Sequence, residues 1–568
     1  MSIRSFLILT ALLCGCAPVS APPANDTSAT DGVALFSAAT LTASESITTE
    51  AIREVVAEIS ADRYAGRGPG SEGDRAARAY LAGRLAAAGF RPGAADGSWE
   101  QPFGLIGIRA DQPSSWAFSS EVGDLILDQS DDFIVASGVQ AAVASVSDAE
   151  VVFVGYGIQA PEYDWDDYKD ANLEGKVLLM LNNDPDWDPD LFGGDTRLYY
   201  GRWTYKYESA ARQGAVGAII IHTTPSAGYP WQVVQTSWSG EQFELPAGAE
   251  PRLQVAAWVT EDAARELVDQ SGLDLDALIT AAREPGFIPV PLQLRTSIEL
   301  QNSLSQATTA NVIGLLDGSD PELADEVVVY MAHHDHLGVA EPTPGDDPNV
   351  DRIYNGARDN GIGVAVVTAI ADSLAALPER PRRSTLIAFV GAEEQGLLGS
   401  KFLAAEPVVP AGRMAALLNF DGGNIWGRTS DISFVGYGKS TLDEVADIVA
   451  SLQGRIVRPD QYPDRGYYYR SDQFSLAQIG VPGIFLRGGS EFIGRPAGWG
   501  EQQLLAYERE NYHQPSDELT DDWDFSGLIE DARFGFLAGL LIANGDGLPA
   551  WRPGDEFEAA RLEALDAL

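Results

Sequence analysis

Three of the five histidines in this sequence lie within four residues, at His333, His334 and His336. They follow an apolar stretch, residues 327–332, that is typical of a buried strand. Neutral imidazole is a favoured ligand of zinc. A histidine cluster after a strand can also be purely structural, so this cluster alone leaves both interpretations open.

Acidic residues follow two further apolar stretches in the same way. Glu393 and Glu394 come shortly after residues 385–390, and Asp421 comes directly after residues 415–420. In open α/β sheets, ligands bind outside the carboxyl ends of the strands. We therefore expect these carboxylates and the histidines to converge on one place.

Two loops can add side chains to the same place. A glycine-rich loop, residues 355–361, presents Asp359 just before a helix, and residues 511–515 contain His513. Two histidines and several carboxylates suit a pair of zinc ions, because zinc accepts nitrogen and oxygen ligands and a carboxylate can bridge two metals. Hydrolysis at such a site also needs a free carboxylate that moves a proton.

The elements that must position these side chains alternate along the second half of the chain. Apolar strands at 327–332, 385–390 and 415–420 alternate with helices expected at 362–377 and 526–543. This alternation predicts an α/β fold with a mixed, largely parallel sheet flanked by helices. Two earlier helical patterns, 50–59 and 74–88, precede it, and Gly89 should end the second.

The sequence divides into six segments with different patterns. A charged start, a short apolar run and Cys16 are typical of a lipoprotein signal peptide with a lipid on Cys16; a plain secretory signal is the alternative. The pattern from 149 to 289 is strand-rich and carries no candidate ligand set, so this insert is expected to shape substrate access. The segments are a signal peptide, 1–16; a flexible tether, 17–45; a first part of the main domain, 46–148; the insert, 149–289; a second part of the main domain, which carries the candidate metal ligands, 290–550; and an acidic tail, 551–568.

The composition limits the binding partners. With 83 acidic and 38 basic residues the formal net charge is −45, which argues against binding nucleic acid or anionic lipid. Membrane contact is expected only through the N-terminal lipid, which predicts a bacterial cell-envelope location facing the periplasm, with the outer membrane favoured and secretion as the alternative. The two cysteines, Cys14 and Cys16, leave no internal disulfide in a processed chain.

The motifs together resemble those of the M28 family of metallopeptidases. They are Ala-His-His-Asp-His-Leu-Gly from Ala332, Asn-Gly-Ala-Arg-Asp-Asn from Asn355, Gly-Ala-Glu-Glu-Gln-Gly from Gly391, Asn-Phe-Asp from Asn419 and Asn-Tyr-His-Gln-Pro from Asn511. Each is weak alone, but five in this order are specific. The insert resembles a protease-associated (PA) domain, on Val-Gly-Tyr-Gly-Ile from Val154 and Gly-Ala-Val-Gly from Gly214.

The resemblance implies a zinc exopeptidase fold and a role for each motif residue. Glu393 is the implied general base for a water that bridges two zinc ions, Asp335 orients a histidine ligand, and Tyr512 hydrogen-bonds the oxyanion. The implied metal ligands are His333, Asp359 as the bridge, Glu394, Asp421 and His513. The bond between Asp359 and Asn360 is expected to be cis.

Several positions depart from the family pattern, among them Gly422 and Gly423 after Asp421. His334 stands where close relatives usually have tyrosine, and Arg358 puts a positive charge beside the bridging carboxylate, which would weaken metal binding. His334 and His336 are expected to support the ligands, and His222, at the end of an apolar strand of the insert, is expected to be structural.

The expected function is a co-catalytic di-zinc aminopeptidase that acts on peptides. A carboxypeptidase or dipeptidase of the same family is the first alternative, and a non-catalytic binding protein on this scaffold is the second. The sequence does not decide which peptide end is cut, which side chain is preferred or how many chains assemble.

Overall fold

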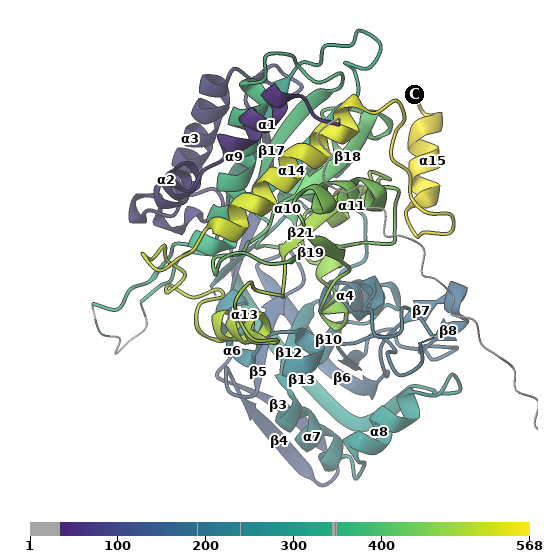
Figure 1. The fold of residues 1–568 in the computed structure, drawn as a ribbon. Coiled ribbons are helices and arrows are strands. Elements are labelled where there is room, and N and C mark those ends of the chain that lie inside the picture. The colour runs from purple at the N-terminus through teal and green to yellow at the C-terminus, as the bar shows by residue number, and fades with distance from the viewer. Residues whose placement is uncertain (1–34, 190, 239, 343–346, 348) are drawn as a thin grey trace, which may run out of the picture.

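The structure is a computed structural model that describes residues 35–568 except 190, 239, 343–346 and 348. The predicted signal peptide, Cys16 and residues 17–34 of the predicted tether lie outside the described residues. Within the described part, every helix is too short or too polar to cross a lipid bilayer. The described chain forms two lobes, which lie at the top and bottom of Figure 1.

The main lobe is built on a mixed sheet whose four central strands are parallel, as predicted. The carboxyl ends of these four strands therefore lie at one edge of the sheet. Antiparallel pairs flank them on both sides. In spatial order the strands are β1 (Arg91–Pro92), the end of β13 (Val290–Leu316), β17 (Ser384–Val390), β14 (Val327–His333), β18 (Met414–Asn419), β21 (Gly483–Gly488), β19 (Asp431–Val435) and β20 (Ile456–Arg458).

Both faces of this sheet are covered by helices. Along β14, Val328 and Tyr330 belong to the larger hydrophobic core, whereas Val327 and Val329 belong to the core of the opposite face. A strand buried on both faces is a continuous apolar run, which is why these strands were visible in the sequence. Helices α2 (Thr49–Ile59), α3 (Glu72–Ala88), α9 (Ile362–Ala375), α11 (Leu442–Leu452) and α14 (Ser526–Asn544) cover the first face, and α10 (Leu398–Ala405) and α12 (Gln473–Gln478) the second.

Capping residues explain where the early helices begin and end. The Thr48 side chain accepts a hydrogen bond from the amide of Ala51 and begins α2, and Ser71 does the same for Asp74 in α3. Gly89 ends α3 with a φ of 91°, a left-handed conformation that favours glycine. The predicted end of this helix is therefore confirmed.

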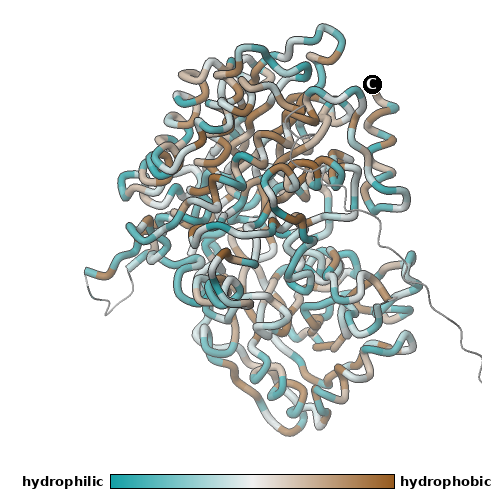
Figure 2. The backbone as a smooth tube through the Cα atoms, in the orientation of Figure 1, coloured by the Kyte–Doolittle hydropathy of each residue, from teal (hydrophilic) through white to brown (hydrophobic). Residues whose placement is uncertain are grey.

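The insert lobe is β-rich and has hydrophobic cores of its own. In Figure 2, hydrophobic segments are visible in both lobes. Its strands are β3 (Ser115–Ser120), β4 (Gly123–Asp128), β5 (Phe133–Ser137), β6 (Val143–Phe153), β9 (Val177–Leu181), β10 (Gly217–His222), β11 (Glu241–Glu244) and β12 (Val255–Thr260). Its helices are α4 (Trp203–Arg212), α5 (Thr224–Ala227), α6 (Trp231–Ser237), α7 (Glu261–Gln270) and α8 (Leu275–Ala282).

A long two-stranded ribbon joins the two lobes. Strand β13 pairs with β6 in the insert lobe at its start, with β2 (Glu100–Asp111) over residues 301–312, and with β17 in the main lobe at its end. One strand therefore belongs to both lobes, so the sheets are continuous across the molecule.

Two of the expected boundaries differ in the structure. Residues 115–148 lie in the insert lobe, because Trp116 and Phe118 are buried in its core, so the predicted start at 149 is too late. Residues 38–45 of the predicted tether form a helix, α1 (Ala38–Glu45), and Ala43 packs into the main core. The C-terminal tail is packed as well, since Trp551 and Phe557 are buried beside α15 (Glu558–Asp566).

Candidate metal centre

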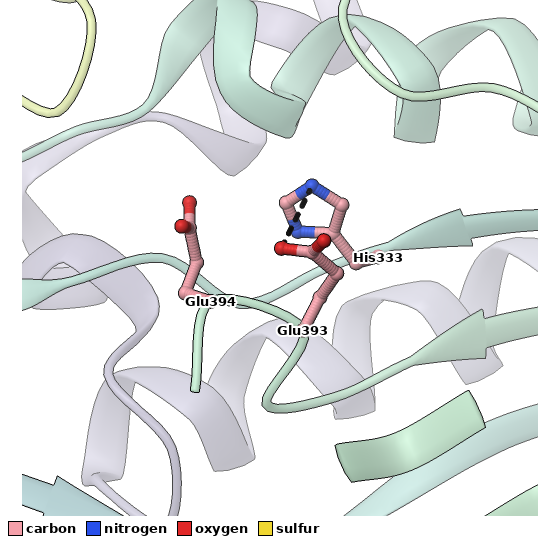
Figure 3. A group of neighbouring side chains, drawn as sticks. All are labelled: His333, Glu393 and Glu394. Carbon is pink, nitrogen blue, oxygen red and sulfur yellow. Dashed lines mark ion pairs between the residues drawn. The ribbon is translucent and has the colours of Figure 1, made fainter. Parts of the chain in front are cut away.

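The carboxyl ends of three parallel strands meet at the predicted place. Strand β14 ends at His333, β17 leads into the loop with Glu393 and Glu394, and β18 leads to Asp421. Figure 3 shows His333, Glu393 and Glu394 projecting to the same side of this edge. The Glu393 loop turns at Ala392, which has a φ of 57°, an uncommon value for a residue other than glycine.

The donor atoms form two groups that share Asp359. His333 Nε2 lies 3.3 Å from Asp359 Oδ1 and 3.4 Å from Asp421 Oδ1. His513 Nε2 lies 3.5 Å from Asp359 Oδ2 and 2.9 Å from Glu394 Oε2. Donors about 2.0–2.1 Å from a tetrahedral zinc lie about 3.3 Å apart, so both groups have the spacing that zinc requires. The structure thus brings together all five predicted ligands, and the peptide bond between Asp359 and Asn360 is cis, as expected.

The electrostatics of the cluster favour a bound cation. His513 Nε2 is buried among these carboxylates without a hydrogen-bond partner in the described structure. Burial alone would lower the pKa of His333 and His513, yet the surrounding carboxylates raise the pKa of His513 to about 10 and that of His333 well above its usual value. So much uncompensated negative charge in a buried site is the environment that a divalent cation stabilises.

Glu393 takes part in none of the four donor contacts that define the two groups. Its Oε2 lies 4.0 Å from His333 Nε2, and its side chain is only 11% exposed. Burial raises the pKa of Glu393 well above its ordinary value, with Asp421 and Glu394 adding to the effect. Burial also acts to raise the pKa of Glu394, but His513 and His336 together outweigh it and lower that pKa to about 2. The pKa values of these two adjacent glutamates are therefore shifted in opposite directions, which suits Glu393 for proton transfer and Glu394 for metal binding.

Asp335 contacts the glutamate loop as well as His333. Its carboxylate accepts hydrogen bonds from the backbone amides of Glu393 and Glu394, at 3.0 and 3.3 Å. The 3.8 Å between Asp335 Oδ1 and His333 Nδ1 is too long for a hydrogen bond. The two groups form an ion-pair contact at this distance, and the role of Asp335 in orienting His333 stays a prediction beside its observed contact with the glutamate loop.

The other two histidines of the cluster support the site. His334 Nε2 lies 3.0 Å from Asp74 Oδ1 on α3, and His336 Nδ1 lies 2.6 Å from Glu394 Oε1. His336 also falls within one possible donor group, together with Asp359 and Glu394. Since Glu394 Oε1 already contacts His336, its Oε2 is the oxygen that faces His513.

Two residues that shape the site, Asp517 and Asn360, were given no role in the sequence analysis. Asp517 accepts the backbone amides of Arg358 and Asp359, at 3.0–3.2 Å. Asn360 bonds the carbonyl of Phe420 and so ties the Asp359 loop to the end of β18. Asp517 lies four residues after His513, but the sequence pattern of a single aspartate in a polar loop does not predict that its side chain is buried.

Arg67 is a buried arginine that connects several segments around the site. Its guanidinium group is 1% exposed and donates to the carbonyls of Ile59, His334, Asn355 and Gly356. It therefore links the segment that follows β14 to the loop that carries Asp359.

The insert lobe also reaches the metal centre. Ser237, the last residue of α6, has its hydroxyl 2.9 Å from His513 Nδ1, the ring nitrogen opposite the metal-facing one. Tyr512 stacks on the His513 ring with centroids 4.0 Å apart. His513 itself has a φ of 57°. The orientation of this ligand is therefore fixed partly by a residue 276 positions away.

Two cavities meet at Glu393, Glu394 and Tyr512. One has a volume of about 140 Å³ and lies entirely beside the metal donors, bounded by main-lobe residues together with Gly228 of the insert. The other, about 770 Å³, runs between the two lobes. A substrate lying across the metal centre would thus have a small pocket on one side and a wide cleft on the other.

Comparisons with known proteins agree with this description. Residues 311–534 match the family model described as Peptidase family M28. "Leupeptin-inactivating enzyme 1" of Streptomyces exfoliatus is 29% identical over 231 residues, 38% of this chain and 50% of that protein. "Aminopeptidase NAALADL1" of Mus musculus is 33% identical over 124 residues, 20% of this chain and 14% of that protein. The chain thus spans half or less of the length of these curated relatives.

A solved structure shares the fold. The "Aminopeptidase from Aneurinibacillus sp. strain AM-1" aligns with a TM-score of 0.51 and 18% identity, covering 91% of this chain and 97% of that one. The matched residues 311–534 begin in β13, run through β14, β17, β18 and α9 and end within α14, and they contain every donor described above. This part of the chain belongs to peptidase family M28.

Proposed function

We propose that this protein is a di-zinc exopeptidase that removes N-terminal residues from peptides. The observation that carries the proposal is the Asp359 carboxylate, which has one oxygen in each donor group. Such a carboxylate suits two metal ions a few ångströms apart. The proposed ligands are His333 and Asp421 for one ion and Glu394 and His513 for the other.

The chain's own residues supply the remaining chemistry. Bound zinc ions would polarise the scissile carbonyl and lower the pKa of a water molecule. Glu393, buried and with a raised pKa, is placed to accept the proton of the attacking water and to deliver it to the leaving amine. The carbon–oxygen bond forms, the carbon–nitrogen bond breaks, and Tyr512 is proposed to donate a hydrogen bond to the oxyanion.

The two cavities support an exopeptidase over an endopeptidase. The smaller one holds little more than one residue, whereas the cleft between the lobes leaves room for the rest of a peptide. The names of the relatives favour an aminopeptidase. A carboxypeptidase or dipeptidase would bind its peptide in the same two cavities, with the peptide running in the opposite direction.

One digestion experiment tests the proposal. The purified protein is incubated with peptides of ten to fifteen residues, with and without a chelator, and the products are read by mass spectrometry. We expect ladders from the N-terminus that disappear with the chelator, and about two zinc ions per chain by metal analysis. Ladders from the C-terminus would favour the alternative direction, and no cleavage with metal bound would contradict the proposal.

The cellular location is a separate proposal. We infer from the signal-peptide pattern that Cys16 carries a lipid and anchors the protein in the bacterial cell envelope. The Cys16→Ser protein should then lose membrane association in a fractionation experiment. A Cys16→Ser protein that is processed and sediments with membranes like the wild type would contradict this.

A further inference from the structure

Three arginines line the small cavity beside the metal donors: Arg358, Arg470 and Arg487. Each guanidinium group packs over an aromatic ring. The Cζ of Arg487 lies 3.8 Å from the centre of the Tyr467 ring, and the Cζ of Arg358 lies 4.1 Å from that of Tyr507. Arg470 contacts Tyr467 and, from the insert lobe, Tyr229, at 5.4 and 5.3 Å. The rings fix the planes of the guanidinium groups and leave their N–H edges available.

No carboxylate of the described chain pairs with these three arginines within 4 Å. The Arg358 guanidinium group donates to the Gly423 carbonyl, at 2.9 Å, and Nη1 of Arg470 is buried without a hydrogen-bond partner in the described part of the chain. The neighbouring Arg465 shows the contrast, because it pairs at 2.6 Å with Glu508, which also lines the cavity, and so neutralises that carboxylate.

Asp460 is the remaining lining carboxylate outside the metal centre. It accepts the Tyr462 amide at 2.9 Å and makes no ion pair within 4 Å with Arg487. Outside the four carboxylates of the metal centre, the wall therefore carries three guanidinium groups against one carboxylate that makes no ion pair within 4 Å. Buried cations without partners cost free energy, and a guanidinium fork matches a carboxylate through two parallel hydrogen bonds.

We propose that this cavity binds a carboxylate group carried by the terminal residue of the substrate. This deepens the proposed exopeptidase function and rests on it. For an aminopeptidase the carboxylate is the side chain of an N-terminal aspartate or glutamate; for the opposite direction of cleavage it is the α-carboxylate of the C-terminal residue. The chain as a whole has a net charge of −45, which repels acidic peptides, so their recognition requires a local positive wall.

Matched peptides test the proposal on the zinc-loaded full chain. Peptides of one sequence begin with Asp, Glu, Asn, Gln or Leu, and each is made with a free and with an amidated C-terminus. Hydrogen bonds to charged groups predict a preference of about 10- to 100-fold in kcat/KM for Asp over Asn and Glu over Gln. If the α-carboxylate is bound instead, the same factor appears between the free and amidated forms, whatever the first residue.

Binding of free L-aspartate and L-glutamate, against L-asparagine and L-glutamine, is measured by calorimetry as a readout that needs no turnover. Arg487→Gln and Arg358→Gln should each reduce the acidic preference about tenfold or more, and Arg487→Lys should restore only part of it. Arg495→Gln is the control, because Arg495 also packs over a ring, that of Trp499, but does not line the cavity. Thermal unfolding of each variant separates loss of binding from loss of folding.

The outcomes separate this inference from the proposed function. Peptide cleavage with equal rates for acidic, amide and amidated forms overturns the carboxylate pocket and leaves the exopeptidase standing. Selective binding of acidic amino acids without any cleavage supports the pocket and overturns the exopeptidase. Equal preference in the wild type and Arg487→Gln, with both folded, also overturns the pocket.

Discussion

Each lobe of this protein has a histidine at the end of a strand in a parallel pair, and the two histidines have opposite surroundings. His333 ends β14 among carboxylates, which raise its pKa well above the usual value. His222 ends β10, packs against the rings of Trp231 and Trp258, and donates from Nε2 to the Tyr229 carbonyl at 3.1 Å. Burial lowers the pKa of His222 to about 4.

The comparison shows that a histidine at a strand end does not by itself make a metal site. The main lobe adds carboxylates from two neighbouring strand ends and from two loops, whereas aromatic rings surround the histidine of the insert lobe. The same local sequence pattern therefore gives a charged site in one lobe and an apolar contact in the other.

The largest expected effect is in the main lobe, on replacing Glu393. Glu393→Gln keeps the shape but cannot accept a proton, so turnover should fall about 10²- to 10⁴-fold. Metal content, measured by mass spectrometry of the digested protein, should stay at the wild-type level. Near wild-type turnover in this variant would contradict the assignment of Glu393 as the base.

Replacing the adjacent glutamate should act on metal binding instead. Because an amide is a poorer ligand than a carboxylate, Glu394→Gln should lose one zinc ion, with an affinity loss of more than the roughly 10- to 100-fold that outer-shell changes cause. Competition with a chromogenic chelator measures this. Unchanged affinity would mean that Glu394 is not a ligand.

In the insert lobe we expect a pH effect on stability from His222. Its pKa is lowered to about 4 in the folded state from an ordinary 6.5, so the unfolded state takes up the proton first. The stability of the neutral form is present above pH 6.5 and is lost as the pH falls toward 4, by about 3 kcal/mol.

His222→Phe removes this titration while keeping an aromatic ring in the pocket. Denaturant unfolding of both proteins at pH 7 and pH 4.5 isolates the contribution of His222 as a difference. Equal pH dependence in the two proteins would contradict the proposed neutral state of His222.

The smallest expected effect is at the contact between the lobes. Ser237→Ala removes the hydroxyl at His513 Nδ1, and we expect a loss of up to about tenfold in zinc affinity and a smaller loss in turnover, at the low end for outer-shell contacts. Ser145→Ala, on an exposed part of the same lobe, is the control. If Ser237→Ala and Ser145→Ala behave alike, the insert lobe shapes access only, as the sequence suggested.

The sequence alone determined the strands and their shared edge. Residues 327–332, 385–390 and 415–420 are apolar on both faces, and this requires a covered parallel sheet whose carboxyl ends lie together. With that edge known, His333, Glu393 and Asp421 had to be neighbours. Similar reasoning identified the helix at 526–543, because it is apolar over most of its circumference.

Only the tertiary structure decided how separate segments meet. The strands of residues 115–148 alternate between apolar and polar residues as strands of either lobe can. Their membership of the insert lobe therefore depends on which core buries Trp116. Ser237 reaches His513 because α6 packs over the metal centre, and the three cavity arginines come from three separate loops and strands. Hydrophobic pattern and local propensity act over a few residues, whereas these contacts depend on how two lobes and their long shared ribbon pack in space.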